Sequence, residues 1–278
     1  MKHPPLSRLR VVVRGGGDLG SGVVYRLWRC GFSVLVTELA HPLLIRRAVA
    51  FGSAVLEDSI TIEGTTARRA DSLAEILQIQ SNNEIPVLID PEGLICAKYE
   101  PSILIDARML KRTPERQPFK SLLTIGLGPG FSPPENCDVV IETKRGHTLG
   151  KVIREGSALP DSREPDPVMG ISSKRVLRAP ADGVITGLVP IGELVSKGQI
   201  IARIGEHPVT ASFDGALRGL LHDGLVVQAG DKIADIDPRD EPTYCFSISD
   251  KALAIGGGVL EAVFSSPTIW EHLKAEPT

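Results

Sequence analysis

An internal repeat constrains the fold most strongly. Residues 181–204 recur as residues 213–236, with ten identical positions out of twenty-four at a constant offset of thirty-two. The matched positions include Asp182/Asp214 and Gly183/Gly215, and glycines at matched places indicate turns with positive φ or close backbone approach. One copy is too short to bury a core alone, so the two copies are expected to pack against each other as one small β module.

The residues of this repeat resemble the barrel-sandwich fold of biotinyl and lipoyl carrier domains. The resemblance covers about residues 178–238 and rests on a glycine, an apolar position and a second glycine ahead of each apolar run. Such carriers hold their cofactor on a lysine of the hairpin between the halves. Residues 205–211 read Gly-Glu-His-Pro-Val-Thr-Ala, without lysine. We therefore expect no covalent biotin or lipoate, and a module that serves as a scaffold, an interaction surface or a cover for a ligand.

A glycine motif follows the first predicted strand. Residues 9–14 form a β-branched run, and Gly15, Gly17 and Gly20 then match G-x-G-x-x-G ahead of an amphipathic stretch at 23–29. In dinucleotide-binding turns the three glycines turn the chain, admit a pyrophosphate and let the helix pack on the strand. The alternative is a tight βα turn with no ligand.

Three further side chains are candidates for the same ligand. Glu38 ends a second predicted strand at 33–37, where a carboxylate can accept hydrogen bonds from ribose hydroxyls; it would repel a 2′-phosphate and so favours NAD over NADP. Arg46 and Arg47 lie in a helix-like segment and, being adjacent, cannot face the same way. One of them is a candidate phosphate ligand; the alternative is a pair of solvated charges.

Polar residues end several other predicted strands. The runs at 87–90, 103–106, 122–125 and 139–142 are almost continuously apolar, as in strands buried on both faces. They predict an α/β fold: a Rossmann-like, doubly wound, mostly parallel sheet plus the smaller all-β barrel-sandwich domain. Ligands of open α/β sheets bind outside the carboxyl ends of strands. The candidates there are Asp106, Arg108, Gly128, Glu142, Arg145 and His147, although such residues also occur as ordinary strand ends.

Composition limits the classes of function. The chain has 278 residues, 42% hydrophobic and 23% charged, with a formal net charge of −3 and no basic run, so a nucleic-acid surface is not expected. The sequence predicts neither a membrane helix nor a signal peptide, and therefore a cytoplasmic protein. The four cysteines and six histidines are scattered, which predicts no disulfide framework and no metal site. Oligomeric state stays open.

Domain boundaries follow from composition. Residues 159–173 contain three prolines without periodicity and predict a linker. We expect a nucleotide-binding domain at 1–160, the repeat module at 174–240, and a C-terminal segment at 241–278 that packs back on the first domain. In that segment residues 244–251 suggest a strand and a polar turn, and Gly256–Gly258 a glycine loop ahead of a final short helix.

One cysteine has a candidate chemical role. Asp250 and Lys251 follow Cys245 in the same predicted turn, and a lysine near a thiol lowers its pKa. Catalysis would then fall to Cys245, Asp250, Lys251 and His147. A buried structural cysteine is the alternative.

Taken together, several ordered blocks resemble a known family. RGGGDLGSG, which contains Asp18, and VTELAHPLLIRR, LIDARM, GLGPGF, VIETKRGHTLGKVI, EGSALP, LRAPADGVI and SISDKALAIGGGVLEAV resemble the YqeB-type accessory proteins of selenium-dependent molybdenum hydroxylases. The middle region is also distantly similar to the XdhC-type chaperones of xanthine dehydrogenase. The resemblance implies a cytoplasmic maturation factor that helps to insert or modify the molybdenum cofactor of a client hydroxylase. It supplies no reaction mechanism.

The leading hypothesis is therefore an accessory protein whose glycine turn holds a nucleotide or the dinucleotide tail of molybdopterin. In this hypothesis Gly15, Gly17 and Gly20 bind diphosphate, and Cys245 carries sulfur or selenium as a persulfide-type species. Two alternatives remain open: an NAD-dependent oxidoreductase with His147 or Lys251 as proton donor, and a structural chaperone with an empty glycine turn.

Overall fold

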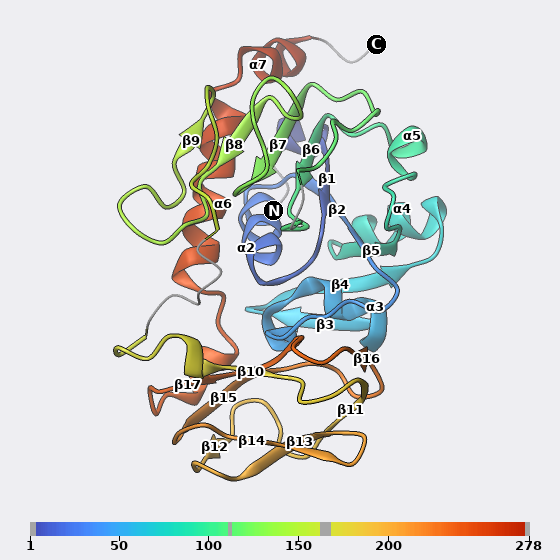
Figure 1. Cartoon of the computed structure of the whole chain (residues 1–278). Helices are drawn as coiled ribbons and strands as arrows, with labels where there is room; N and C mark the ends of the chain where they lie inside the picture. Colours follow the sequence, from blue (N-terminus) through green and yellow to red (C-terminus); the bar gives the residue numbers. More distant parts are fainter. Residues whose placement is uncertain (1–3, 111–112, 162–167, 276–278) are drawn as a thin grey trace.

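The computed structural model describes residues 4–110, 113–161 and 168–275. A nine-stranded sheet forms the larger part of the molecule, and two smaller sheets lie below it in Figure 1. The strands of the large sheet are arranged in the order β3-β4-β5-β2-β1-β6-β7-β8-β9. Their bounds are β1 Arg10–Arg14, β2 Ser33–Glu38, β3 Ser59–Ile62, β4 Thr65–Ala70, β5 Ile85–Ile89, β6 Ile103–Asp106, β7 Leu123–Leu127, β8 Val139–Ile141 and β9 Val152–Ile153.

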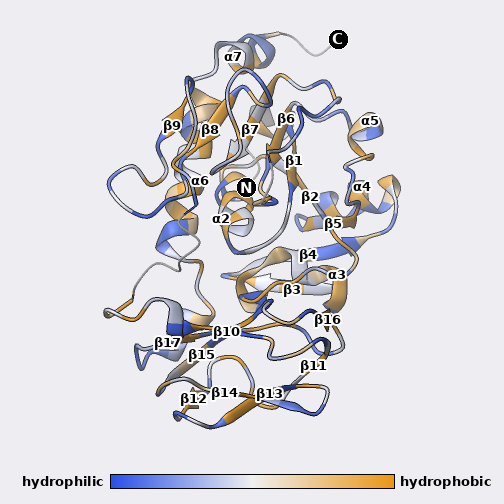
Figure 2. Ribbon diagram, viewed as in Figure 1, coloured by the Kyte–Doolittle hydropathy of each residue, from blue (hydrophilic) through white to orange (hydrophobic). Residues whose placement is uncertain are grey.

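The central strands form because their apolar runs are buried on both faces. Figure 2 shows the middle of the sheet as its most hydrophobic part. Val11 and Val13 of β1 pack in the core shared with helices α2 (Asp18–Arg29) and α6 (Asp250–Phe264). Val12 lies in a second core with Ile76 of α4 (Leu73–Ser81) and Tyr99 of α5 (Cys96–Tyr99). The remaining helices are α1 Pro4–Ser7, α3 Ala54–Glu57 and α7 Pro267–Lys274, with 3-10 turns η1 Arg47–Val49, η2 Phe51–Ser53, η3 Ser173–Arg175 and η4 Pro242–Cys245.

Helices α2 and α6 approach each other closely because glycines lie between them. A Cβ on Gly22 would lie 2.5 Å from the carbonyl oxygen of Ala252, and one on Gly256 would lie 2.7 Å from that of Gly22. The predicted glycine loop at 256–258 is therefore wrong, since these residues lie inside α6. Gly256 packs against α2 and Gly258 against the backbone of Gly150, and these close contacts offset the intrinsic cost of about 1 kcal/mol for a helical glycine.

The predicted Rossmann-like, doubly wound sheet is also wrong. The large sheet is mixed, because β3 pairs antiparallel with β4 and β9 pairs antiparallel with β8. Among the described residues between β6 and β7, and between β7 and β8, no helix occurs. Loops replace the crossover helices that a doubly wound sheet requires. The C-terminal helix α6 covers part of the sheet instead.

The repeat folds into two four-stranded antiparallel sheets. Their orders are β10-β17-β15-β12 and β14-β13-β11-β16, so the short second strand of each repeat joins the sheet of the other repeat. This arrangement of two separate sheets corrects the prediction of a biotinyl- or lipoyl-like barrel-sandwich domain. The bounds are β10 Val176–Arg178, β11 Gly183–Gly187, β12 Leu194–Val195, β13 Ile200–Ile204, β14 His207–Thr210, β15 Gly215–Leu220, β16 Val226–Val227 and β17 Lys232–Asp237.

The repeat module packs on the segment between β2 and β3. A Cβ on Gly219 would lie 2.6 Å from the carbonyl oxygen of Ile45, and the Glu57 carboxylate lies 3.0 Å from Nε2 of His222. Ile45 and Leu56 also pack against the apolar core of the module. The domain boundaries remain predictions, and residues 162–167 of the proposed linker lie outside the described residues.

In the described ranges, no single helix is long and apolar enough to cross a membrane. The pair α6 and α7, bent by 62°, passes that test on length and composition only.

Candidate functional site

The carboxyl ends of the parallel strands meet at one edge of the large sheet. Arg14 at the end of β1 is level with Asp106 of β6, and Asp106 is level with Gly126 of β7. Strand order reverses beside β1, because the chain continues to β2 on one side and later to β6 on the other. Ligands of open parallel sheets bind outside the carboxyl ends, at such a reversal. We call this edge, with the glycine turn Gly15–Gly17, the candidate site.

Three glycines around this turn are required by the packing of the protein itself. Gly15 has φ of +99°, and a Cβ there would lie 3.0 Å from the Ala107 backbone. A Cβ on Gly16 would lie 2.6 Å from the nitrogen of Gly52, which donates a hydrogen bond to the Gly16 carbonyl. A Cβ on Gly20 would lie 2.2 Å from the carbonyl oxygen of Gly15. These glycines therefore need no ligand to explain them.

Gly17 differs from its neighbours. It has an ordinary φ of −70°, and a Cβ there would meet only Leu44 Cδ2, at 3.6 Å. It is partly exposed at the N-cap of α2, where no side chain of the described residues caps the helix. The first-turn N–H groups of a helix carry a partial positive charge and bind anions. A bare Gly17 leaves open the space in front of them.

Glu38 lies against the glycine turn. Its Oε2 accepts a hydrogen bond from the Gly16 nitrogen at 2.7 Å, and its Oε1 accepts one from the Leu39 nitrogen at 2.8 Å. Burial raises the pKa of this carboxyl, although the two backbone donors act in the opposite direction. Glu38 thus stabilises the conformation of the turn. It is the carboxylate that the sequence analysis proposed as an acceptor for ribose hydroxyls.

Arg46 and Arg47 point to different partners, as their adjacency predicted. Arg46 forms an ion pair with Asp18 at 3.0 Å and donates to the carbonyls of Tyr244 and Ser247, also at 3.0 Å. Arg47 donates to the carbonyl of Leu220 at 3.0 Å. Arg46 compensates the charge of Asp18 at the start of α2 and ties that helix to the segment before α6. Both guanidinium groups are engaged by the protein, so the structure offers neither as a free phosphate ligand.

Asp106 and Arg108 form a tight pair at the end of β6. Nη2 of Arg108 lies 2.6 Å from Oδ2 of Asp106, whose side chain is buried. Beside this pair lies Arg14, a fully buried residue that the sequence analysis did not single out. Arg14 donates to the carbonyl of Pro91 and to the side chain of Gln117, and burial followed by the charge of Arg108 lowers its pKa. In the sequence, the one indication of this residue was a charged side chain directly after the apolar run Val11–Val13.

Gly128 and Glu142 shape the loops that follow β7 and β8. Gly128 has φ of +74° and donates to the carbonyl of Ile141 at 2.9 Å. The buried Glu142 carboxylate accepts hydrogen bonds from the backbone nitrogens of Lys144 and Leu159, at 2.7 and 2.8 Å. Glu142 therefore anchors two loops and does not face an open space.

Arg145 and Asp250 come together from distant parts of the chain. Their side chains form two hydrogen bonds of 2.7 and 2.9 Å, which lower the pKa of Asp250 to about 2. Asp250 lies in the first turn of α6, and His147 is exposed in the turn that carries Arg145. The pair thus connects the loop after β8 to the N-terminus of α6. Lys251, next to Asp250, is partly exposed.

Cys245 is fully buried in η4. Burial raises the pKa of its thiol, while Arg46 and Arg218 act against that rise and Asp237 reinforces it. Arg46 and Arg218 are thus two positive charges that act on this thiol, in the role that the sequence suggested for Lys251. A sulfur-carrier role for Cys245 remains a prediction.

Two helix N-termini come close together at this edge of the sheet. Arg46 connects Asp18, in the first turn of α2, with Ser247, two residues before Ser249, the N-cap of α6. Two helix N-termini therefore lie at one edge, and their partial charges add there. The acidic residues at this edge are each bound by an arginine or by backbone N–H groups.

Comparison of the whole sequence with protein-family models finds no match. The chain is similar to the uncharacterized protein YqeB of Escherichia coli, with 46% identity over 261 residues. The match covers 94% of this chain and 48% of that protein, so the chain spans about half the length of this relative. The similarity supports the YqeB-type resemblance drawn from the motifs. It does not bear on a role with molybdenum hydroxylases.

Solved structures give only distant likenesses. The apo ectoine utilization protein EutE (DoeB) of Ruegeria pomeroyi has 10% identity, a TM-score of 0.24, and coverage of 81% of this chain and 85% of that chain. An aspartoacylase family protein of Mesorhizobium loti has 11% identity, a TM-score of 0.25, and coverage of 82% and 84%. Scores this low assign neither a fold nor an activity to this chain.

Proposed function

We propose that this chain is a cytoplasmic accessory protein that binds the phosphate groups of a nucleotide, or of the dinucleotide form of molybdopterin, at Gly17 and the first turn of α2. We further propose that it serves the maturation of a molybdenum hydroxylase, selenium-dependent enzymes included. The second part rests on the resemblance to YqeB-type accessory proteins.

One observation carries the binding proposal. Gly15, Gly16 and Gly20 are each fixed by a backbone contact shorter than 3.1 Å to an added Cβ, whereas Gly17 meets nothing closer than 3.6 Å. Gly17 also has a φ that any residue adopts. Serine or aspartate would cap the helix at least as well as glycine and would lose less conformational entropy on folding, so the use of glycine at this open position supports a ligand that approaches the backbone.

The neighbouring residues suit such a ligand. Arg46 removes the repulsion that the Asp18 carboxylate alone would exert on a phosphate. We propose that a ribose hydroxyl beside the phosphate donates to a remaining lone pair of the Glu38 carboxylate, which already accepts from the Gly16 nitrogen. The bound molecule supplies the molybdenum chemistry to the client enzyme, and the chain's part is to hold and orient it.

The binding experiment uses a Gly17→Asp variant with Gly17→Ser as its neutral control. Asp and Ser are both good N-cap residues, so neither variant is expected to lose stability. Calorimetric titration with cytidine diphosphate and with NAD is expected to show binding to the native protein and weaker binding to Gly17→Ser, whose side chain occupies the space in front of the helix. Gly17→Asp, whose carboxylate also repels a phosphate, should bind at least about tenfold more weakly than the native protein. Equal binding by Gly17→Asp would contradict the proposal.

A second measurement identifies the natural ligand and the client. Mass spectrometry of material released from the denatured protein should detect a pterin dinucleotide or a cytidine nucleotide. Cells that lack this chain should contain inactive molybdenum hydroxylase, restored by the native gene and not by Gly17→Asp. NAD alone, together with a requirement for a hydride acceptor, would favour the oxidoreductase; full hydroxylase activity without the chain would refute the accessory role.

A further inference from the structure

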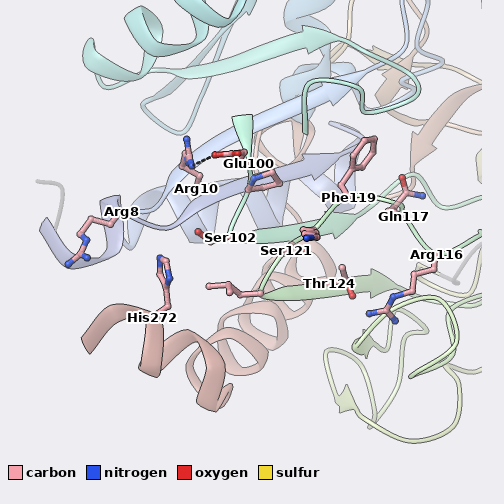
Figure 3. A pocket seen from close by; sticks show the side chains of 13 residues that line it. Arg8, Arg10, Glu100, Ser102, Arg116, Gln117, Phe119, Ser121, Thr124 and His272 are labelled. Atoms are coloured by element: carbon pink, nitrogen blue, oxygen red, sulfur yellow. Dashed lines mark ion pairs between the residues drawn. The ribbon is translucent and has the colours of Figure 1, made fainter. Parts of the chain in front are cut away.

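A cavity lies at the edge of the large sheet opposite the candidate site. Arg10 begins β1, Ser102 precedes β6 and Leu122 precedes β7, so these residues mark the amino ends of three neighbouring strands. The cavity that they line has a volume of about 610 Å³. We call it the amino-edge hollow. Figure 3 shows Arg8 and His272 at one end, Arg116 and Gln117 at the other, and Ser102 and Ser121 between them.

The connection between β6 and β7 forms part of this hollow. Its described residues contain no helix, and residues 116–122 supply one wall. Arg8, just after α1, and His272 of α7 supply another. A volume of this size lies within the range of small-molecule sites, about 300–1,000 Å³.

The hollow is positively charged in a negatively charged protein. Its lining contains four arginine or lysine side chains, Arg8, Arg10, Arg116 and Lys120, and one carboxylate, Glu100. The chain as a whole carries a formal charge of −3. A local excess of one sign inside a concave surface concentrates ligands of the opposite sign.

Several of these cations are available to a ligand. Within the described part of the chain, Lys120 forms no hydrogen bond or ion pair and is exposed. Arg8 donates to the neutral carbonyl of Ala275. Arg10 lies 3.6 Å from Glu100, whose side chain is 76% exposed, so this ion pair is weak. Arg116, by contrast, is held at 2.6 Å by Asp138.

The walls of the hollow offer hydroxyl groups and an aromatic ring. Ser102, Ser121 and Thr124 line it. The Thr124 hydroxyl donates to Asp138 at 2.7 Å, whereas Oγ of Ser121 is buried with no hydrogen-bond partner among the residues that the structure describes. A buried hydroxyl left unpaired costs free energy, which a ligand oxygen would recover. Phe119 adds a partly buried aromatic ring, which also packs against the apolar core around Tyr99. The lining therefore combines cations, donors and a ring.

We propose that the amino-edge hollow binds a small phosphorylated molecule with an aromatic or heterocyclic body. The phosphate lies among Arg8, Arg10 and Lys120 and accepts a hydrogen bond from Ser121, while the ring packs on Phe119. This site is separate from the glycine turn, and its occupation does not depend on Gly17.

The test uses the full chain carrying Gly17→Asp, so that the candidate site does not contribute. Phenyl phosphate is titrated by calorimetry, with inorganic phosphate as the probe that lacks a ring. Phenyl phosphate is expected to bind more tightly than inorganic phosphate, and to lose affinity as salt is raised. The Arg10→Gln/Lys120→Gln double variant should bind at least about tenfold more weakly.

Two controls keep the result specific. Lys197→Gln/Arg203→Gln removes the same charge from the exposed surface of the repeat module and should leave binding unchanged. Glu100→Gln removes the lining carboxylate and should strengthen binding. Failure of phenyl phosphate to bind, equal loss in both double variants, or no gain in Glu100→Gln would overturn the proposal. Melting curves of every variant confirm that the chain is folded.

Discussion

The two edges of the large sheet use the same residue types in opposite ways. At the carboxyl edge, Arg46 and Arg108 are held by carboxylates at 3.0 and 2.6 Å, and Arg46 is almost entirely buried. At the amino edge, Lys120 and Arg10 are exposed, and Arg10 has only the weak pairing with Glu100 among the described carboxylates. Basic side chains therefore maintain the structure at one edge and remain available to a ligand at the other. The glycine turn, not an arginine, is the open feature of the carboxyl edge.

The largest expected difference between the two edges is in how much the loss of a basic side chain lowers the free energy of unfolding. Arg46→Met leaves Asp18 and the carbonyls of Tyr244 and Ser247 without their donor, and should lower the free energy of unfolding by about 3 kcal/mol. Lys120→Met, in the hollow, should change it by less than about 0.5 kcal/mol. Urea denaturation measures both. Similar losses in the two variants would remove the distinction between the edges.

A smaller difference is expected within the glycine turn. Gly20→Ala forces a Cβ to within 2.2 Å of the Gly15 carbonyl oxygen and should cost about 1–3 kcal/mol through overpacking. Gly17→Ala places its Cβ in open space and should cost about 1 kcal/mol or less, because alanine is a poorer N-cap than glycine. Thermal and urea unfolding compare the two. If Gly17→Ala were as damaging as Gly20→Ala, Gly17 would be a packing glycine.

The smallest effect concerns the exposed pair Arg145–Asp250. Since the folded pKa of Asp250 is depressed from 3.8 to about 2, the pair stabilises the protein above about pH 4 and loses this contribution as the pH falls through 2. The carboxylate is 73% exposed, so Asp250→Asn should cost only about 0.5 kcal/mol at pH 7. That difference should shrink with acid and with salt. A loss that persisted at pH 2 would point to a role of Asp250 other than ion pairing.

The sequence located many strands but not their connections. The predicted run at 103–106 coincides with β6, and that at 33–37 nearly fills β2, because apolar β-branched runs report burial directly. The sequence of residues 107–122 did not show whether a loop or a crossover helix connects β6 to β7. The prediction for Gly256 was wrong for a different reason. Glycine occurs both in loops and where two helices pack closely, and the sequence alone does not distinguish these two uses.

For the site, sequence placed the residues but not their partners. Strand-end position correctly brought Asp106 and Glu142 to the carboxyl edge, yet their carboxylates are occupied by Arg108 and by backbone nitrogens. The amino-edge hollow escaped notice because Arg8 and His272 come from opposite ends of the chain. Only tertiary packing unites such residues, and no short motif records it.

The exchange of short strands in the repeat module has a consequence for its two halves. Because β12 completes the sheet of β15 and β17, and β16 completes that of β11 and β13, each half supplies a strand that the other cannot provide for itself. A gene encoding one half would yield a polypeptide with an unfinished sheet, able to close it only by pairing with a second molecule. The covalent link between the halves makes that pairing intramolecular, and so independent of protein concentration.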